Sequence, residues 1–450
     1  MSPHLSERLV WGASAVLALV TLVLLVRNIL AIPAHVPLDP NEGWNAAHAL
    51  AAMAGHGLYP PPQALMVNNY PPLSFYLIGA IARRGGDVLI AGRWVALGGF
   101  LATVTGIAAV LRRMDCRPRA IVLGALFFAG LLLVASDYVG MDDPQLLGHA
   151  VQLGALLCLL RDRTMIAAAL FAISLFIKHN LLAMPLAAGL WLLAQDRRAG
   201  MAFVLWGVAF VLSGLVLFQL GFGASLIAQL ASPRLSSLAN LKAAVPRLWW
   251  VVLPAIAMTG LWPDRHGLFS LLYVGAALLL GLIFAAGDGV DANAFFDLGI
   301  ALSLGLGLAV ERGRWPILAA ASALPLLIFL AVNFRDNNFF FTRDFAQSSA
   351  RDIAFLKSRP GPALCDQLSL CLWAGKGAEV DVFNVGEAIK AGARSPAPLA
   401  GMIADHRFAT LQLIDRDGLG PDVRRAIEKN YRADHGDDNG AFLVPVTRAP

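Results

Sequence analysis

Apolar runs separated by short charged turns recur through the first three quarters of the sequence, and this pattern restricts what the chain can fold into. A helix that crosses the ~30 Å hydrocarbon core of a bilayer needs about 20 mostly apolar residues. Uncharged runs approach that length repeatedly before residue 335. The chain is 58% hydrophobic and 14% charged, whereas soluble proteins carry about 25% charged residues. The pattern excludes a soluble fold and a single membrane anchor.

We predict a polytopic α-helical membrane protein with about 11 transmembrane helices. The first run is too long for the apolar core of a typical signal peptide, so we expect it to be retained. Several runs are nearer to about 14 residues than 20, so we expect them to be tilted, extended by polar turns or partly re-entrant. The predicted spans are residues 9–26, 88–111, 120–136, 144–160, 164–177, 181–194, 201–220, 248–262, 267–286, 294–310 and 315–333.

The distribution of Lys and Arg predicts the orientation. With the N-terminus in the cytoplasm, the cytoplasmic turns hold 12 basic and 6 acidic residues, and the other side of the membrane part holds 8 basic and 9 acidic residues. Basic residues favour the cytoplasmic side. They lie between apolar runs and form no basic patch, so we expect no nucleic-acid partner. Eleven crossings would place the C-terminal segment in the periplasm of a bacterial inner membrane.

The charges also divide the chain into two predicted domains. Residues 335–450 carry 15 basic and 15 acidic residues, so the net charge of +5 lies within residues 1–334. We expect a transmembrane domain over residues 1–334, with a periplasmic loop at 33–87, and a small periplasmic α/β domain over 335–450. The latter has predicted helices at 346–357 and 421–431 and predicted strands at 363–373 and 408–414. Cys365 and Cys371 are either paired or free, because a continuous strand would hold them too far apart for a disulfide.

Polar residues gather at the predicted outer face. Asp39 and Asp143 each have a simpler interpretation as helix-start residues. Capping does not require two adjacent carboxylates, which repel each other unless a cation or substrate intervenes, so we favour a functional role for Asp142 and Asp143. Lys178 has a simpler interpretation as a lysine whose side chain extends to the membrane–water interface, and Asp291 has one as a loop residue. The polar groups are Asp39 with Glu42; Asp142 with Asp143; Lys178, His179 and Asn180; and Asp288, Asp291, Asn293 and Asp297.

Prolines interrupt the first predicted outer loop between residues 60 and 72, so no continuous helix can cross there. We expect two interfacial helices that form a shelf over the bundle. Its aromatic residues, Trp44, Tyr70, Phe75 and Tyr76, are predicted to lie at the level of the lipid headgroups. A shelf above buried acids suits an enzyme that takes one substrate from the bilayer and another from water.

Ordered motifs across nearly the whole chain resemble those of the bacterial GT-C glycosyltransferases. These are relatives of the protein O-mannosyltransferases and of the aminoarabinose transferase that modifies lipid A. The Tyr-Pro-Pro and Asp-Asp-Pro-Gln segments are the most specific. The matching segments are NEGWNA at 41–46, GLYP at 57–60, NYPPLSFY at 69–76, GR at 92–93, MDDPQ at 141–145, KHN at 178–180, residues 287–297, AGK at 374–376, RFA at 407–409 and LGP at 419–421.

The resemblance implies transfer of a sugar from a polyprenyl-phosphate carrier to a lipid or glycan acceptor outside the cytoplasm, usually with inversion. It also implies an acidic base in the first outer loop, a second acidic site at Asp142 and Asp143, and basic residues that hold the lipid phosphate. Many relatives have Asp-Glu where this chain has Asn41-Glu42, so the base is either Glu42 or Asp39. The candidates for the phosphate are Lys178, His179, Arg234, Lys242 and Arg247, and those for other substrate contacts are Asn69, Tyr70, Asp291 and Asn293.

Other functions stay open at this stage. Some relatives bind a divalent metal, so Asp142 and Asp143 are candidate ligands, although no all-protein cage is visible. A transporter or lipid flippase is the main alternative, but we find neither inverted repeats nor broken midplane helices. A non-catalytic sugar-binding or assembly protein is a third hypothesis. It predicts that Glu42→Gln and Asp142→Asn leave product formation unchanged.

Overall fold

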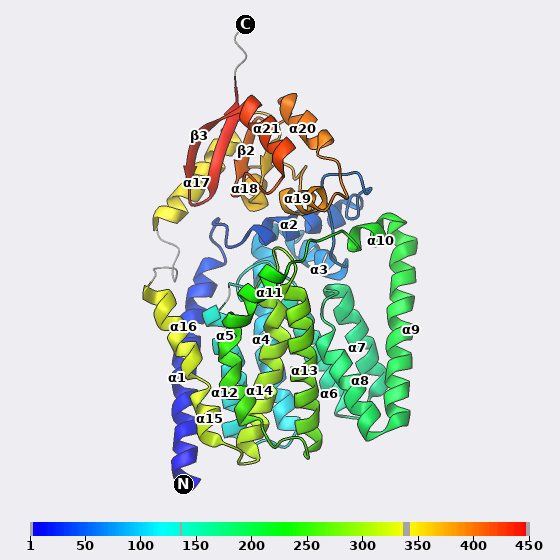
Figure 1. The fold of residues 1–450 in the computed structure, drawn as a ribbon, viewed down its shortest axis with the longest axis vertical. Coiled ribbons are helices and arrows are strands. Elements are labelled where there is room, and N and C mark those ends of the chain that lie inside the picture. Colours follow the sequence, from blue (N-terminus) through cyan, green and yellow to red (C-terminus); the bar gives the residue numbers. More distant parts are fainter. Residues whose placement is uncertain (1–2, 136, 336–342, 447–450) are drawn as a thin grey trace.

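The computed structural model describes residues 3–135, 137–335 and 343–446 and is mostly helical (Figure 1). Every predicted apolar run falls on one or more helices. Residue 136, at the end of one run, and residues 336–342, next to the predicted domain boundary, lie outside the described residues. The helices of the bundle are α1 (Pro3–Ala31), α4 (Val88–Arg113), α5 (Pro118–Ala135), α6 (Gln145–Leu159), α7 (Thr164–Ile177), α8 (Ala183–Gln195), α9 (Arg197–Phe222), α12 (Val252–Ala257), α13 (Arg265–Ala285), α14 (Phe296–Glu311), α15 (Pro316–Ala321) and α16 (Leu324–Arg335).

The lengths of these helices agree only in part with the predicted crossings. Among the described residues, 5 helices are long and apolar enough to cross a membrane by length and composition: His4–Ala31, Val88–Arg113, Arg197–Phe222, Arg265–Ala285 and Ala292–Glu311. The run at 248–262 is broken into a 3₁₀ segment, η1 (Val245–Val251), and the short α12. Eleven crossings therefore stay a prediction.

Local sequence explains where three long helices begin. Asp87, Asp196 and Asp264 each precede a helix, and each carboxylate accepts hydrogen bonds from two backbone N–H groups of the first turn. Those N–H groups have no partner within the helix, so the caps stabilise α4, α9 and α13 at their starts. The helices also differ in how deeply they are buried. Nearly all of α14 is buried at the centre of the bundle, whereas α9 lies at its side, and only Gly200 and Phe203 of α9 are buried (Figure 1).

Short helices cover one end of the bundle. They are α2 (Pro40–Ala54), α3 (Leu73–Ala82), α10 (Ser225–Leu230) and α11 (Leu238–Ala244). The predicted shelf is therefore helical, and the level of its aromatic residues relative to the lipid headgroups stays a prediction. Trp44 and Phe75 are buried, and the Phe75 ring contacts those of Trp44 and His48. Residues from the C-terminal part of the chain pack over α2, and Tyr76 is exposed. The helix α1 begins at the opposite end of the bundle (Figure 1).

Residues 343–446, called the C-terminal region below, form an α/β layer above α2 (Figure 1). The strand order is β1-β2-β4-β3; β1 and β2 are parallel, and β4 is antiparallel to both of its neighbours. The elements are α17 (Arg343–Ser358), β1 (Ala363–Cys365), α18 (Leu368–Trp373), α19 (Val382–Lys390), α20 (Ala397–Ala404), β2 (Thr410–Leu413), α21 (Pro421–Asn430), β3 (Tyr431–Asp437) and β4 (Gly440–Pro445).

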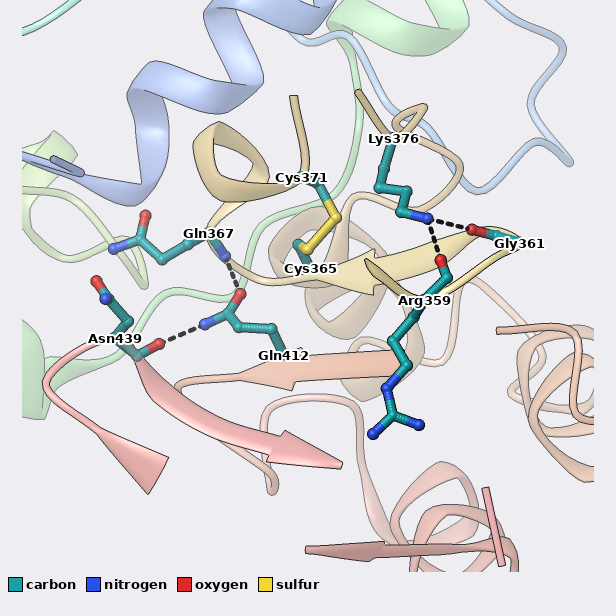
Figure 2. The surroundings of a disulfide bond; sticks show 8 residues. All are labelled: Arg359, Gly361, Cys365, Gln367, Cys371, Lys376, Gln412 and Asn439. Atoms are coloured by element: carbon teal, nitrogen blue, oxygen red, sulfur yellow. Dashed lines mark hydrogen bonds between the residues drawn. A yellow bond between two sulfur atoms is a disulfide. The ribbon is translucent and has the colours of Figure 1, made fainter. Parts of the chain in front are cut away.

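The prediction of a single strand over 363–373 was wrong. The strand β1 ends at Cys365, and the chain turns into α18, which brings Cys371 back to form a disulfide with a Cα–Cα distance of 6.1 Å (Figure 2). Gln412 supports the turn, because its side chain accepts a hydrogen bond from the backbone N–H of Gln367 and donates to the backbone oxygen of Asn439 (Figure 2). The pairing that the sequence left open is therefore present.

Candidate functional site

Glu42 forms a buried ion pair with Arg93. The guanidinium Nε lies 2.7 Å from Oε1 and Nη2 lies 2.8 Å from Oε2, and both side chains are fully buried. The same carboxylate accepts the backbone N–H groups of Leu38, at 3.0 Å, and Asp142, at 3.1 Å. Glu42 therefore has its acceptor positions filled, and the pair joins α2, α4 and the turn before α6.

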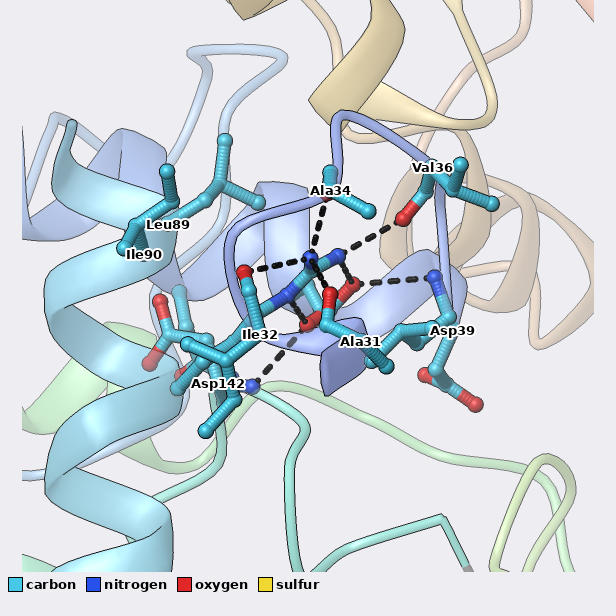
Figure 3. A network of polar contacts seen from close by, with 12 residues as sticks. Ala31, Ile32, Ala34, Val36, Asp39, Leu89, Ile90 and Asp142 are labelled. Atoms are coloured by element: carbon cyan, nitrogen blue, oxygen red, sulfur yellow. Dashed lines mark hydrogen bonds and ion pairs between the residues drawn. The ribbon is translucent and has the colours of Figure 1, made fainter. Parts of the chain in front are cut away.

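Arg93 also fixes the segment that leads into α2. Its guanidinium donates to the backbone oxygens of Ala34 and Val36, each at 2.7 Å, and of Ile32, at 3.2 Å (Figure 3). A buried guanidinium needs this many acceptors, because an unpaired buried charge is very costly. The network holds residues 32–38 against the bundle and sets the position of Asp39.

Asp39 is the N-cap of α2 and lines the main cavity. Its Oδ1 accepts the backbone N–H of Asn41 at 2.8 Å. Burial raises the pKa of the Asp39 carboxyl to about 6; the Asn41 hydrogen bond lowers it, and the charges of Asp291 and Glu42 raise it further. A carboxyl group with a pKa near neutrality that faces a cavity is suited to general base catalysis.

Asp143 and Lys178 form a second buried ion pair. The Lys178 Nζ atom lies 2.9 Å and 2.8 Å from the two oxygens of Asp143, and it lies 4.8 Å from the centre of the Tyr70 ring. Asn41 donates to Asp143 at 3.4 Å, and the backbone N–H of Gln145 donates at 2.7 Å. Lys178 lines the cavity, and Asp143 holds it from behind.

Asp142 has different surroundings from Asp143. Its carboxylate is fully buried, neither oxygen has a hydrogen-bond partner among the described residues, and it packs against Gly92, where a Cβ atom would not fit. Burial, followed by the charges of Glu42 and Asp143, raises the pKa of Asp142 well above its usual range. Asp143 is bonded to Lys178 and Asn41, whereas the Asp142 carboxylate bonds to neither. Within the described ranges, no three His, Cys, Asp or Glu side chains are grouped to hold a metal ion.

The main cavity, of about 710 Å³, lies between the end of the bundle and the C-terminal region. Most of the sequence-predicted substrate residues meet there. Lys242 and Arg247 do not line it; both are exposed on α11 and η1. Asp297 lines a small adjoining pocket, where it accepts a hydrogen bond from Tyr273. The predicted residues that line the main cavity are Asp39, Asn69, Tyr70, Lys178, His179, Arg234, Asp291 and Asn293.

The C-terminal region supplies the other wall of this cavity, which the sequence analysis did not predict. That wall includes Asp381, the N-cap of α19, whose Oδ2 accepts the Trp44 indole N–H at 2.9 Å. Burial raises the pKa of Asp381 to about 6. Asp381 does precede a helix-like segment, so the sequence signal predicts a cap but not the contact with Trp44. The other lining residues from this region are Asp366, Leu368, Val382, Phe383, Asn384 and Ile414.

No protein-family model matches the sequence, and no curated protein matches it. Two solved structures of ArnT from Cupriavidus metallidurans match its fold. The one bound to undecaprenyl phosphate aligns at 14% identity with a TM-score of 0.60, over 97% of this chain and 98% of that chain. The apo structure aligns at 12% identity with a TM-score of 0.61, over 96% of this chain and 98% of that chain. This chain therefore shares its fold with the two ArnT structures, which is the fold that its sequence resemblance implies.

Proposed function

We propose that this chain transfers a sugar from a polyprenyl-phosphate donor to an acceptor hydroxyl at the periplasmic face of the bacterial inner membrane, with inversion, in envelope glycan or lipid modification. The observation that carries the proposal is that Asp39, Lys178 and Arg234 line one cavity. An acid with a raised pKa and two cations in one cavity suit a reaction that needs a base and a stabilised leaving phosphate. A protein of the same fold has been crystallised with undecaprenyl phosphate.

In the proposed reaction, Asp39 removes the proton from the acceptor hydroxyl. The acceptor oxygen forms a bond with the anomeric carbon of the sugar as the bond from that carbon to the phosphate oxygen breaks. The electron pair of the broken bond leaves with the polyprenyl phosphate. Attack from the face opposite the phosphate inverts the anomeric configuration. One proton is then on Asp39, and water removes it before the next turnover.

The cations have different roles in this proposal. Asp143 neutralises much of the charge of Lys178, so we propose that the ammonium group serves chiefly as an oriented hydrogen-bond donor to the phosphate. Arg234 is exposed to the cavity and supplies the positive charge that stabilises the leaving group. We propose His179, Asn69, Tyr70, Asp291 and Asn293 as further substrate contacts, because they line the same cavity.

Of the two bases that the sequence leaves open, we favour Asp39. Glu42 is buried behind the cavity wall and is already bonded to Arg93, so it would have to break an ion pair to accept a proton. Asp39 needs no such change. We propose that Glu42 positions the entry to α2 and that Asp142 packs beneath it as a structural acid.

The test compares Asp39→Asn with Glu42→Gln in cells that lack the native protein. We expect Asp39→Asn to fold, to bind undecaprenyl phosphate and to reduce transfer by at least about a hundredfold, the typical contribution of a general base. Lipid-linked sugar should accumulate and the modified envelope glycan should disappear, both measured by mass spectrometry. We expect Glu42→Gln to lower the yield of folded protein, because Arg93 would lose its charged partner. Unchanged glycans with Asp39→Asn would contradict the proposed function.

A further inference from the structure

The helix α19 presents one exposed aromatic ring to the main cavity. Phe383 is 41% exposed, whereas its neighbours in the same turn, Val382 and Asn384, are 6% and 8% exposed. Phe383 lines the cavity together with both of them. A large apolar side chain on an otherwise buried turn, facing a cavity, is the kind of surface that a ligand covers.

The ring is held in place although it is exposed. The guanidinium carbon of Arg234 lies 5.5 Å from the centre of the Phe383 ring, which is a cation–π distance. The tip of the ring packs against Gly289, where a Cβ atom would collide with it and where φ is +65°. In addition, Glu387, one turn later on α19, accepts the backbone N–H of Leu235 at 3.2 Å. The residue next to Arg234 and the helix that carries Phe383 are therefore fastened together.

Polar groups surround the exposed ring. Asn384 accepts a hydrogen bond from Asn69 at 3.4 Å, and its amide also bonds to Asp381 at 2.7 Å. Asp366 lines the same wall, and its carboxylate accepts the backbone N–H of Ile414 at 3.0 Å. An aromatic face with amide and carboxylate groups at its edge matches a sugar ring, whose C–H groups are apolar on one face and whose hydroxyls point outward. An isoprenoid chain would offer no partner to the hydrogen-bonding positions that these groups still have free.

We propose that Phe383 is a specificity-determining residue that stacks on a pyranose ring of the acceptor, with Asn384 and Asp366 bonding to its hydroxyls. The acceptor is then a glycan or the sugar headgroup of a glycolipid, bound against the C-terminal wall, while the donor phosphate binds the wall that carries Lys178. This inference rests on the proposed function, because it assigns the acceptor side of the same cavity.

The experiment uses the full-length protein in lipid nanodiscs and three variants, Phe383→Ala, Phe383→Leu and Phe383→Tyr. Trp262→Ala is the matched control, because Trp262 is 70% exposed and lies outside the cavity. One probe is undecaprenyl phosphate, and the other is an array of defined bacterial glycans. We expect glycan retention to fall by about fivefold to tenfold in the Ala and Leu variants, as loss of an aromatic contact would give. It should stay within about twofold of wild type in the Tyr variant and in Trp262→Ala. Undecaprenyl phosphate binding should change by no more than about twofold in all of them, because Arg234 keeps its charge when it loses the contact with the ring.

Three results would overturn the inference: wild-type protein that retains no glycan, Phe383→Leu that retains glycans as well as wild type does, or undecaprenyl phosphate binding that falls as much as glycan retention does with Phe383→Ala. Each is distinct from failure of the proposed function. If Asp39→Asn abolishes transfer in cells and Phe383→Leu transfers normally, only the role of Phe383 is wrong. If Asp39→Asn transfers normally, the proposed function is wrong.

Discussion

At the scale of single residues, two acids of similar chemistry have different surroundings because only one of them bonds to a residue distant in the sequence. Asp39 and Glu42 lie three positions apart, and both have the chemistry of a base. Glu42 is bonded to Arg93, 51 positions later, whereas Asp39 lines the cavity. The sequence predicts that both acids lie near one face, because each follows the first apolar run. It could not separate them, because the separation depends on which one a distant arginine reaches.

Asp39 should make transfer depend on pH. Only the ionised carboxylate accepts a proton, and burial raises its pKa to about 6. We therefore expect kcat/KM to fall about tenfold for each pH unit below about 6 and to level off above it. The measurement is a pH profile of initial rates with purified protein, with the integrity of the fold checked at each pH. A profile that shows no acidic limb near pH 6 would argue against Asp39 as the base.

At the scale of secondary structure, the apolar runs correctly predicted where helices lie, whereas the turn after residue 365 was not predicted. Each apolar run is helical because a backbone in lipid must satisfy its hydrogen bonds internally. The strand predicted over 363–373 failed because its spacing of Leu364, Leu368 and Leu370 suits two elements joined by a turn as well as it suits one strand. The disulfide that closes this turn depends on the reversal of the chain, which periodicity does not reveal.

The contact between α2 and α18 can be tested at Gly43. A Cβ atom at this position would meet the backbone of Leu368 and Ser369, which cannot move aside cheaply. We expect Gly43→Ala to destabilise the protein by about 1–3 kcal/mol, as other overpacked sites do. Gly98→Ala, on α4, is the control, because nothing lies within 4 Å of its added Cβ atom and Ala favours the helix. Thermal unfolding in detergent should show a lower midpoint temperature for Gly43→Ala and an unchanged one for Gly98→Ala. Equal midpoint temperatures for the two variants would refute the close contact.

At the scale of the whole molecule, the C-terminal region completes a cavity that the bundle begins. Composition predicts both parts, because the charge balance changes near residue 335. Composition could not predict the interface between the two parts. That interface depends on single contacts such as the one between Trp44 and Asp381, 337 positions apart. Val67, from the first loop, also packs in the core of the C-terminal region. The sequence did not predict the cavity wall that carries Phe383, because that wall depends on contacts between distant parts of the chain.

The stability of this interface should depend on pH through the titration of Asp381. Its pKa rises from an ordinary value of 3.8 to about 6 because it is buried between α19 and Trp44. The protonated form is therefore favoured in the folded state. The unfolding free energy should decrease as pH rises from about 4 to about 6 and stay lower above pH 6, by roughly 3 kcal/mol for a pKa change of this size.

The variant Asp381→Asn cannot titrate, so its stability should lack this pH-dependent component, although it loses part of its bonding to Trp44. We expect the gap in Tm between wild type and Asp381→Asn to be widest near pH 4 and to narrow through pH 6, and a gap that does not change with pH would show that Asp381 does not titrate in this range.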